Sequence, residues 1–234
     1  MEEQYVISDR LKTIASYIPE HKRVADIGGD HALLLMYLAK RHQLQHGIVG
    51  ELNEGPFQNA KTRVQAFQCD SLIDVRLGNG LSILSPHEVD VVVIAGMGGN
   101  LITQILEEGK PSLIGVHTLI LQPNISSGLI RKWLVKNGFR IHQETIVKEN
   151  DILYEIIVAI QETSDEIKPE ILYDMGPMLW KERHPLLREK IEYEINSRKR
   201  VLNQLEKGKT AQAISRRQQI QNELYQWEEA LTCL

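Results

Sequence analysis

Short apolar runs alternate with stretches of helical periodicity from the start of the chain to about residue 138. The apolar runs predict strands at 23–26, 47–50, 74–77, 89–95 and 118–121. Between and around them, helical spacing predicts a first helix capped by Ser8, then helices over 32–41, 56–67 and 101–107. A last helix is capped by Ser126 or Ser127 and runs through Asn137. Five alternations of strand and helix predict an α/β fold with a parallel, doubly wound sheet.

The pattern changes after Gly138, where two strand-like runs follow each other at 139–147 and 152–160. The gap 148–151 has room for a turn but not for a crossover helix, so these two strands should be antiparallel. A parallel sheet with this ending resembles the Rossmann-like sheets of S-adenosylmethionine (SAM)-dependent methyltransferases. A dehydrogenase domain more often continues with another crossover helix.

A second unit is predicted after residue 161, where Pro169, Gly176 and Pro177 mark a linker. Apolar residues then recur at helical spacing over 187–205 and again over 220–231, with Gly208 between them. We interpret this as an antiparallel, coiled-coil-like helical hairpin. The predicted domains are 1–161, a cofactor-binding catalytic domain, and 162–234, a helical domain.

Composition narrows the class of protein. A net charge of -4 gives no general attraction to nucleic acid, so an RNA site requires a local basic patch. Such a patch is available at 198–217, which carries Arg198, Lys199, Arg200, Lys207, Lys209, Arg216 and Arg217, although a solvated helix surface explains it equally well. The two cysteines form neither a metal-ligand pair nor a disulfide framework. Without a signal peptide in 1–20 or a long apolar segment, we expect a cytoplasmic monomer or weak dimer that binds no metal or membrane.

The first candidate site is the turn from Asp26 to His31, which follows a strand and precedes a helix. Glycine at Gly28 lets the backbone approach a ligand closely. Carboxylates at Asp26 and Asp30 would repel a pyrophosphate but suit a ligand with a cationic end, and SAM carries an ammonium and a sulfonium. A tight turn with solvated aspartates is the alternative.

Further candidates follow the other strands, because ligands in open α/β sheets bind beyond the carboxyl ends of the strands. Glu51 suits ribose hydroxyls in both NAD and SAM enzymes, so it does not separate them. Asn79 and Gly80 would contact adenine or form an ordinary turn. The glycines of 95–99 favour a ligand site, and the amides at 122–124 would contact a base edge or only lead into a helix.

Six segments together resemble a known family: ADIGGDHA, GELNEGP, DVRLGNGL, IAGMGGNLI, LQPN and ENDILYEI, in this order and spacing. They are similar to the bacterial tRNA (adenine-22 N1)-methyltransferase family, the TrmK type. The likeness spans the chain and includes Met175-Gly176-Pro177 and the helical hairpin. It implies a SAM-dependent enzyme that methylates N1 of an adenine in tRNA.

By matching motif positions, the resemblance implies two sets of site residues. The cofactor site would be lined by Asp26, Gly28, Asp30, His31, Glu51, Asn79, Gly80, Met97 and Gly98. The target base would face Gln122, Pro123, Asn124 and Tyr154. Of these, Asp30, Asn124 and Tyr154 are the candidate catalytic residues. The candidates for binding tRNA come instead from the basic patch at 198–217, and they are Arg198, Lys199, Arg200, Arg216 and Arg217.

Three positions depart from the family pattern. Gly29 replaces a usual Ser or Thr, 32–35 reads Ala-Leu-Leu-Leu instead of Ala-Tyr-Leu-Pro, and Asn100 replaces a frequent Arg. The first two concern the methionine end of the cofactor pocket, and the third a charge near the RNA. Two rivals stay open on sequence alone: an NAD-dependent oxidoreductase, and a non-catalytic RNA-binding protein that retains the fold.

Overall fold

The computed structural model describes residues 7–205 and 210–234, and it divides into two compact units, Met1–Glu166 and Ile167–Leu234. Lys207, Gly208 and Lys209 of the sequence analysis lie outside the described residues. The division falls slightly beyond the predicted boundary after residue 161. Glu162 belongs with the first unit because its carboxylate accepts hydrogen bonds from Arg140 of the sheet, at 2.8 Å and 3.0 Å.

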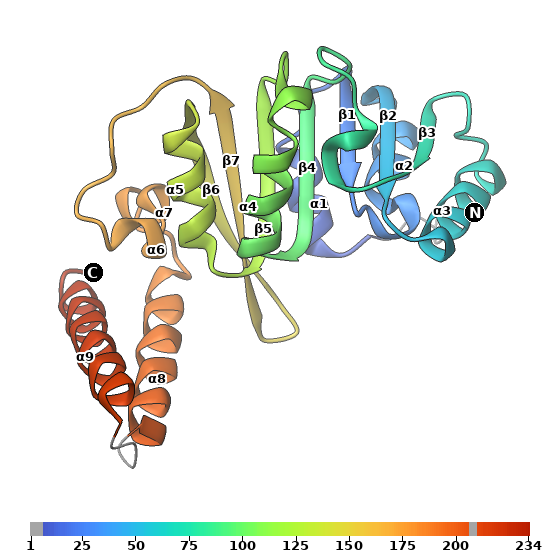
Figure 1. Cartoon of the computed structure of the whole chain (residues 1–234). Coiled ribbons are helices and arrows are strands. Elements are labelled where there is room, and N and C mark those ends of the chain that lie inside the picture. The colour runs from blue at the N-terminus through green and yellow to red at the C-terminus, as the bar shows by residue number, and fades with distance from the viewer. Residues whose placement is uncertain (1–6, 206–209) are drawn as a thin grey trace. The chain divides into compact units, whose positions relative to one another are not determined.

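One mixed sheet forms the centre of the first unit. Its described strands lie in the order β3-β2-β1-β4-β5-β7-β6, parallel from β3 to β5 and antiparallel at β7 and β6 (Figure 1). This confirms the predicted fold class, a Rossmann-like sheet that ends in an antiparallel hairpin. The strands are β1 (Lys22–Ile27), β2 (Leu44–Glu51), β3 (Ile73–Leu77), β4 (Val91–Gly98), β5 (Thr118–Ile125), β6 (Phe139–Glu149) and β7 (Ile152–Gln161).

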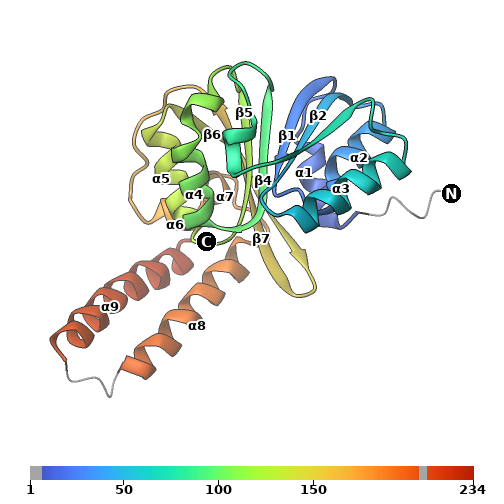
Figure 2. The ribbon, with the colours of Figure 1, turned by 45° about the vertical axis from the view of Figure 1, so that its right-hand side comes forward.

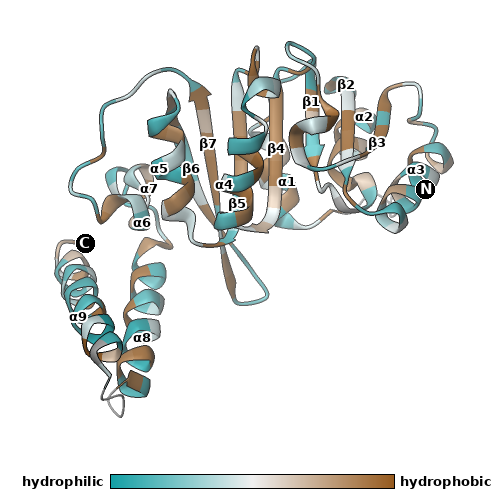
Figure 3. Cartoon of the chain, in the orientation of Figure 1, coloured by the Kyte–Doolittle hydropathy of each residue, from teal (hydrophilic) through white to brown (hydrophobic). Residues whose placement is uncertain are grey.

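Helices cover both faces of the sheet. Three lie on one face, namely α1 (Asp9–Ser16), α2 (Leu33–Lys40) and α3 (Glu54–Ala66), and two on the other, α4 (Gly99–Glu108) and α5 (Ser127–Lys136) (Figure 2). Strand β4 is buried on both faces of the sheet. Val91 and Val93 belong to the core beneath α1 to α3, and Val92 and Ile94, which alternate with them, are buried as well. The central strands are therefore mostly hydrophobic along their length (Figure 3).

Two local predictions were wrong in detail. The glycines of 95–99 do not end β4, which continues to Gly98 through a bulge between Ala95 and Met97. Neither Ser126 nor Ser127 caps α5 with its side chain: Ser126 has a positive φ of 60° and makes no cap hydrogen bond. The Ser127 hydroxyl instead donates to Glu155 of β7 at 3.0 Å. Ser8 does cap α1, as predicted, by accepting from the Leu11 amide.

The second unit holds the predicted helical hairpin. Its described helices are α6 (Leu172–Met175), α7 (Pro177–Lys181), α8 (Leu187–Leu205) and α9 (Ala211–Thr232). The two long helices pack on each other through buried Ile191, Ile195, Ile220 and Trp227. Their remaining surface is largely hydrophilic (Figure 3).

A buried ion cluster fixes the antiparallel end of the sheet. The Arg131 side chain of α5 is fully buried and donates to Glu144 of β6 and Glu155 of β7, and to Ser127 at 2.9 Å. Burial alone would lower the pKa of Arg131. The two carboxylates raise this pKa by more than burial lowers it, so the guanidinium stays charged. One residue thereby connects a helix to both antiparallel strands.

We expect Arg131→Met to lower the free energy of unfolding by about 3–5 kcal/mol, because it removes the buried cation that pairs with buried Glu144 and mostly buried Glu155. The matched control is Arg140→Met, which removes a partly exposed pair with Glu162 and should cost about 0–1 kcal/mol. Urea unfolding of both variants measures the difference. Equal losses would show that the buried cluster has no special weight.

Candidate functional site

The turn after β1 places a buried carboxylate beneath a glycine-rich backbone. Asp26 is only 4% exposed. Burial, and secondly the charge of Glu51, raise the pKa of Asp26 to about 7. Gly28 has a φ of 69°, a conformation that favours glycine, and a Cβ there would lie 2.3 Å from the Met97 methyl carbon of β4. The turn therefore lies directly against the end of β4.

Gly29, a departure from the family pattern, gives its side-chain space to Asp26. A Cβ at Gly29 would lie 2.5 Å from the Asp26 carboxylate oxygen Oδ2. Beyond it, His31 and Ala32 have positive φ values of 65° and 59°, a conformation that non-glycine residues adopt rarely. The side chain of Asp30 lies outside the described part of the chain, so its predicted role stays a prediction.

The ends of β2 and β3 form the next part of the edge. Glu51 is the last residue of β2 and is 7% exposed, and its carbonyl accepts from the Gly78 amide at 2.8 Å. Asn79 is exposed and precedes a short 3₁₀ helix that begins at Gly80. Ile83 packs over this edge, since a Cβ at Gly50 or Gly78 would lie 2.4 Å or 2.5 Å from its side chain.

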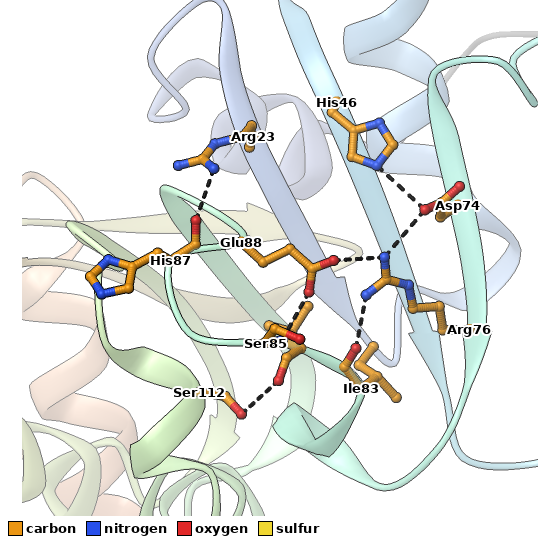
Figure 4. A network of polar contacts seen from close by, with 10 residues as sticks. Arg23, His46, Asp74, Arg76, Ile83, Ser85, His87, Glu88 and Ser112 are labelled. Atoms are coloured by element: carbon orange, nitrogen blue, oxygen red, sulfur yellow. Dashed lines mark hydrogen bonds and ion pairs between the residues drawn. The ribbon is translucent and has the colours of Figure 1, made fainter.

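A network of charged side chains fixes the segment that follows β3, residues 78–88 (Figure 4). Arg76 of β3 donates to the Ile83 carbonyl at 2.9 Å and to Glu88 at 2.8 Å, and forms a 3.2 Å ion pair with Asp74. The hydrogen bond from Arg76 holds the pKa of Glu88 below its usual value. Glu88 also accepts from the Ser85 amide at 2.8 Å, so both ends of the loop are fixed.

The ends of β4 and β5 carry a second polar group. Gln122 and Pro123 are buried, while Asn124 is exposed. The Gln122 side-chain oxygen accepts from the Gly96 amide at 3.1 Å, and its nitrogen donates to the Asn124 oxygen Oδ1 at 3.2 Å. The Asn124 nitrogen donates to the Gly96 carbonyl at 2.8 Å. Both backbone groups of Gly96 in the bulge are thus bound by β5 side chains.

Tyr154 reaches the same edge because β7 runs antiparallel to β5, so that β7 begins where β5 ends. The guanidinium carbon of Arg10 lies 4.9 Å from the centre of the Tyr154 ring. Arg10 Nη1 also donates to the Gln122 oxygen. The sequence analysis did not single out Arg10, since it precedes Gln122 by 112 positions and no local pattern links them.

The structure thus arranges the predicted residues of the first unit along one edge. Asp26, Gly28 and Glu51 lie at the carboxyl ends of β1 and β2, on one side of Met97, and Gln122, Asn124 and Tyr154 lie on the other. His31 is partly exposed in the turn after β1, and Gly98 ends β4 at the start of α4. Asn100 is exposed in the first turn of α4.

The predicted RNA-binding residues belong to the hairpin of the second unit, and they differ in their surroundings. Arg198 pairs with Glu194 and Glu223 and lies 4.9 Å from the Trp227 ring centre. Lys199 pairs with Glu228 at 2.7 Å. Arg200 and Arg216 are exposed and Arg217 partly so, and none of the three forms an ion pair with a described residue.

Two features are absent from the described residues. No group of three or more His, Cys, Asp or Glu side chains is arranged to hold a metal ion there. The described helices include none with the length and hydropathy that crossing a membrane requires.

Comparison with known proteins gives consistent matches. The family model described as TrmK, tRNA (adenine(22)-N(1))-methyltransferase, matches residues 24–229. The tRNA (adenine(22)-N(1))-methyltransferase of Bacillus subtilis (strain 168) is 39% identical over 203 residues, which is 85% of each chain. The crystal structure of the B. subtilis m1A22 tRNA methyltransferase TrmK has a TM-score of 0.90 at 36% identity, covering 97% of this chain and 99% of that one.

A putative tRNA (m1A22) methyltransferase of Streptococcus pneumoniae, solved in complex with S-adenosyl-L-methionine, has a TM-score of 0.86 at 36% identity. The match covers 97% of this chain and all of that one, 100%. Because the family model and these relatives cover most of the sequence and both units, this chain belongs to the tRNA (adenine(22)-N(1))-methyltransferase family.

Proposed function

We propose that this chain transfers the methyl group of S-adenosylmethionine to N1 of an adenine in tRNA, position 22 by its family. One observation carries the assignment of the site: two buried carboxylates and a separate amide cluster flank Met97 along one edge of the sheet. The carboxylates fit a cationic cofactor, and the amides fit a base. The NAD-dependent alternative fits less well, since Asp26 would repel a pyrophosphate and the sheet ends in an antiparallel hairpin.

The residues of the first unit fit S-adenosylmethionine by their chemistry. Asp26 is a buried carboxyl group with a raised pKa, and a nearby cation would stabilise its ionised form. It therefore suits the ammonium group of the cofactor. Glu51 ends β2 where ribose hydroxyls donate in Rossmann-like folds. Asn79 and Gly80 would contact the adenine of the cofactor, with His31, Met97, Gly98 and the predicted Asp30 completing the site.

The chemical step asks mainly for positioning. When bound, S-adenosylmethionine supplies an electrophilic methyl group on a sulfonium. Adenine N1 has an in-plane lone pair and needs no general base, so the protein must align the base and exclude water. Asn124 would accept from the N6 amino group of adenine. Tyr154 would stack on the base and offset part of the cost of flipping it out. Buried Gln122 and Pro123 hold this group in place.

The hairpin would supply the RNA contacts that a net charge of -4 does not provide elsewhere. Arg200, Arg216 and Arg217 are the free cations of the predicted patch within the described residues. Arg198 and Lys199, being paired, would act more through the stability of the hairpin. We further propose a cytoplasmic monomer or weak dimer.

The function is tested with labelled S-adenosylmethionine and a tRNA transcript that carries adenine 22. We expect label in this transcript, a reverse-transcription stop at position 22, and neither in a transcript with that adenine replaced. Asn124→Ala should lower kcat roughly a hundred- to a thousandfold, because a transition-state hydrogen bond is lost, while S-adenosylhomocysteine (SAH) affinity stays near the original value. A labelled transcript without adenine 22 would contradict the assigned position.

The raised pKa of Asp26 predicts a pH-dependent affinity for SAH. Only the ionised carboxylate attracts the ammonium, so binding releases a proton below pH 7, and affinity should fall up to about tenfold per pH unit from 7 towards 5.5. The same shift acts on stability. Since Asp26 ionises near 3.8 when unfolded and near 7 when folded, the free energy of unfolding falls as pH rises through this window. Calorimetry with Asp26→Asn should show both dependences removed.

Replacing Arg200, Arg216 and Arg217 with Gln should weaken tRNA binding and leave SAH binding intact. Each lost phosphate contact should lower the slope of log affinity against log salt by roughly one unit. The control changes Lys12, Lys61 and Lys110 to Gln, three exposed lysines of the first unit. If both triple variants give the same salt slope, the hairpin is not the RNA platform.

A further inference from the structure

Arg10 connects three separate segments of the site. It lies on α1, its Nη1 donates to Gln122 of β5, and its guanidinium covers the ring of Tyr154 on β7. Its Nε is buried and has no hydrogen-bond partner within the described residues. Burying a charged group in this way costs free energy, and this cost indicates that the contacts it does make are important to the site.

The hydrogen bonds around Gln122 have a fixed direction. A guanidinium and a backbone amide can only donate, so Arg10 and Gly96 together require the Gln122 oxygen to face them. Its nitrogen must then point to Asn124, whose Oδ1 accepts at 3.2 Å. At the other end, the Gly96 carbonyl requires a donor, and Asn124 Nδ2 supplies it at 2.8 Å. We call these four residues (Arg10, Gly96, Gln122 and Asn124) the amide relay.

We propose that Arg10 is a positioning residue for methyl transfer: it locks the direction of the amide relay and so fixes the orientation in which Asn124 meets the target adenine. This rests on the proposed function of Asn124. With its direction fixed, the relay keeps Asn124 Oδ1 as an acceptor whose second lone pair remains for the N6 amino group of adenine.

An electrostatic role for Arg10 is excluded by the charge of the product. Methylation at N1 makes the adenine ring cationic, and a nearby guanidinium opposes that charge instead of stabilising it. Arg10 therefore contributes only through the geometry of Gln122 and Tyr154. The backbone places Gly96 beside Arg10: its φ of 76° favours glycine, and a Cβ there would be in ordinary contact with Arg10 Nη1, at 3.6 Å.

Three variants separate these contributions. Arg10→Met removes the donor, Arg10→Lys keeps a cation that only donates, and Gln122→Glu keeps an acceptor for Arg10 and Gly96 but removes the donor to Asn124. The control is Lys12→Met, which removes a charge from the exposed side of the same helix. Each is measured for kcat and KM on tRNA, SAH affinity and thermal unfolding midpoint.

We expect Arg10→Met and Gln122→Glu to lower kcat roughly ten- to a hundredfold, the effect of a hydrogen bond to a charged group. SAH affinity should stay within about twofold, Arg10→Lys should recover part of the loss, and Lys12→Met should match the original protein. Original kcat in Arg10→Met or in Gln122→Glu would overturn the proposal. So would equal losses in Arg10→Lys and Arg10→Met that are accompanied by weaker SAH binding.

A readout without activity keeps the proposal distinct from the proposed function. The side-chain amide signals of Gln122, identified by their loss in Gln122→Glu, should be dispersed and protected from exchange in the original protein and in Arg10→Lys, but averaged in Arg10→Met. Unchanged signals in Arg10→Met would overturn the locking role. If the original protein labels no tRNA, the proposed function fails, and these signals still decide whether Arg10 fixes the relay.

Discussion

Asp26 and Glu51 are buried at the carboxyl ends of two neighbouring parallel strands, and burial first, then the charge of Glu51, raises the pKa of Asp26 to about 7. Under the proposed function, the cationic end of S-adenosylmethionine would offset part of the cost of burying these carboxylates. The surrounding structure maintains the arrangement: Gly29 leaves space for the Asp26 carboxylate, and Ile83, fixed by Arg76, covers the glycines beside Glu51. In our proposal, the cofactor would bind here because these buried carboxylates suit a cation.

The group of residues proposed to face the target base depends on the change from parallel to antiparallel pairing after β5. Because β7 returns directly beside β5, Tyr154 comes to the edge that holds Gln122 and Asn124. The buried Arg131 cluster ties α5 to both antiparallel strands close to Tyr154. The ion cluster that stabilises the antiparallel strands therefore lies close to the tyrosine that these strands position. Along the edge, Met97 and Gly98 of β4 lie between the two sides.

Under the proposed function, the first unit would hold the cofactor and the target base, and the second would bind the phosphates of tRNA. In the first unit, the motifs of the sequence that follow the strands lie along one edge of the sheet, where the chemistry would need fixed geometry. The second is a hairpin whose apolar seam is buried and whose exposed surface carries Arg200 and Arg216. Binding phosphates needs charge more than exact geometry, which suits residues on long helices.

The sequence by itself determined the alternation of strands and helices, the short gap that makes β6 and β7 antiparallel, and the glycine turns at the strand ends. These follow from local periodicity and from which residues tolerate a tight turn. Only the tertiary structure decided that Arg10 meets Gln122 and Tyr154, that Gly96 forms a bulge instead of ending β4, and that Arg131 is buried between two carboxylates. Such partners are far apart in the chain, and their pairing depends on which segments the packed sheet brings together, which no spacing along the sequence records.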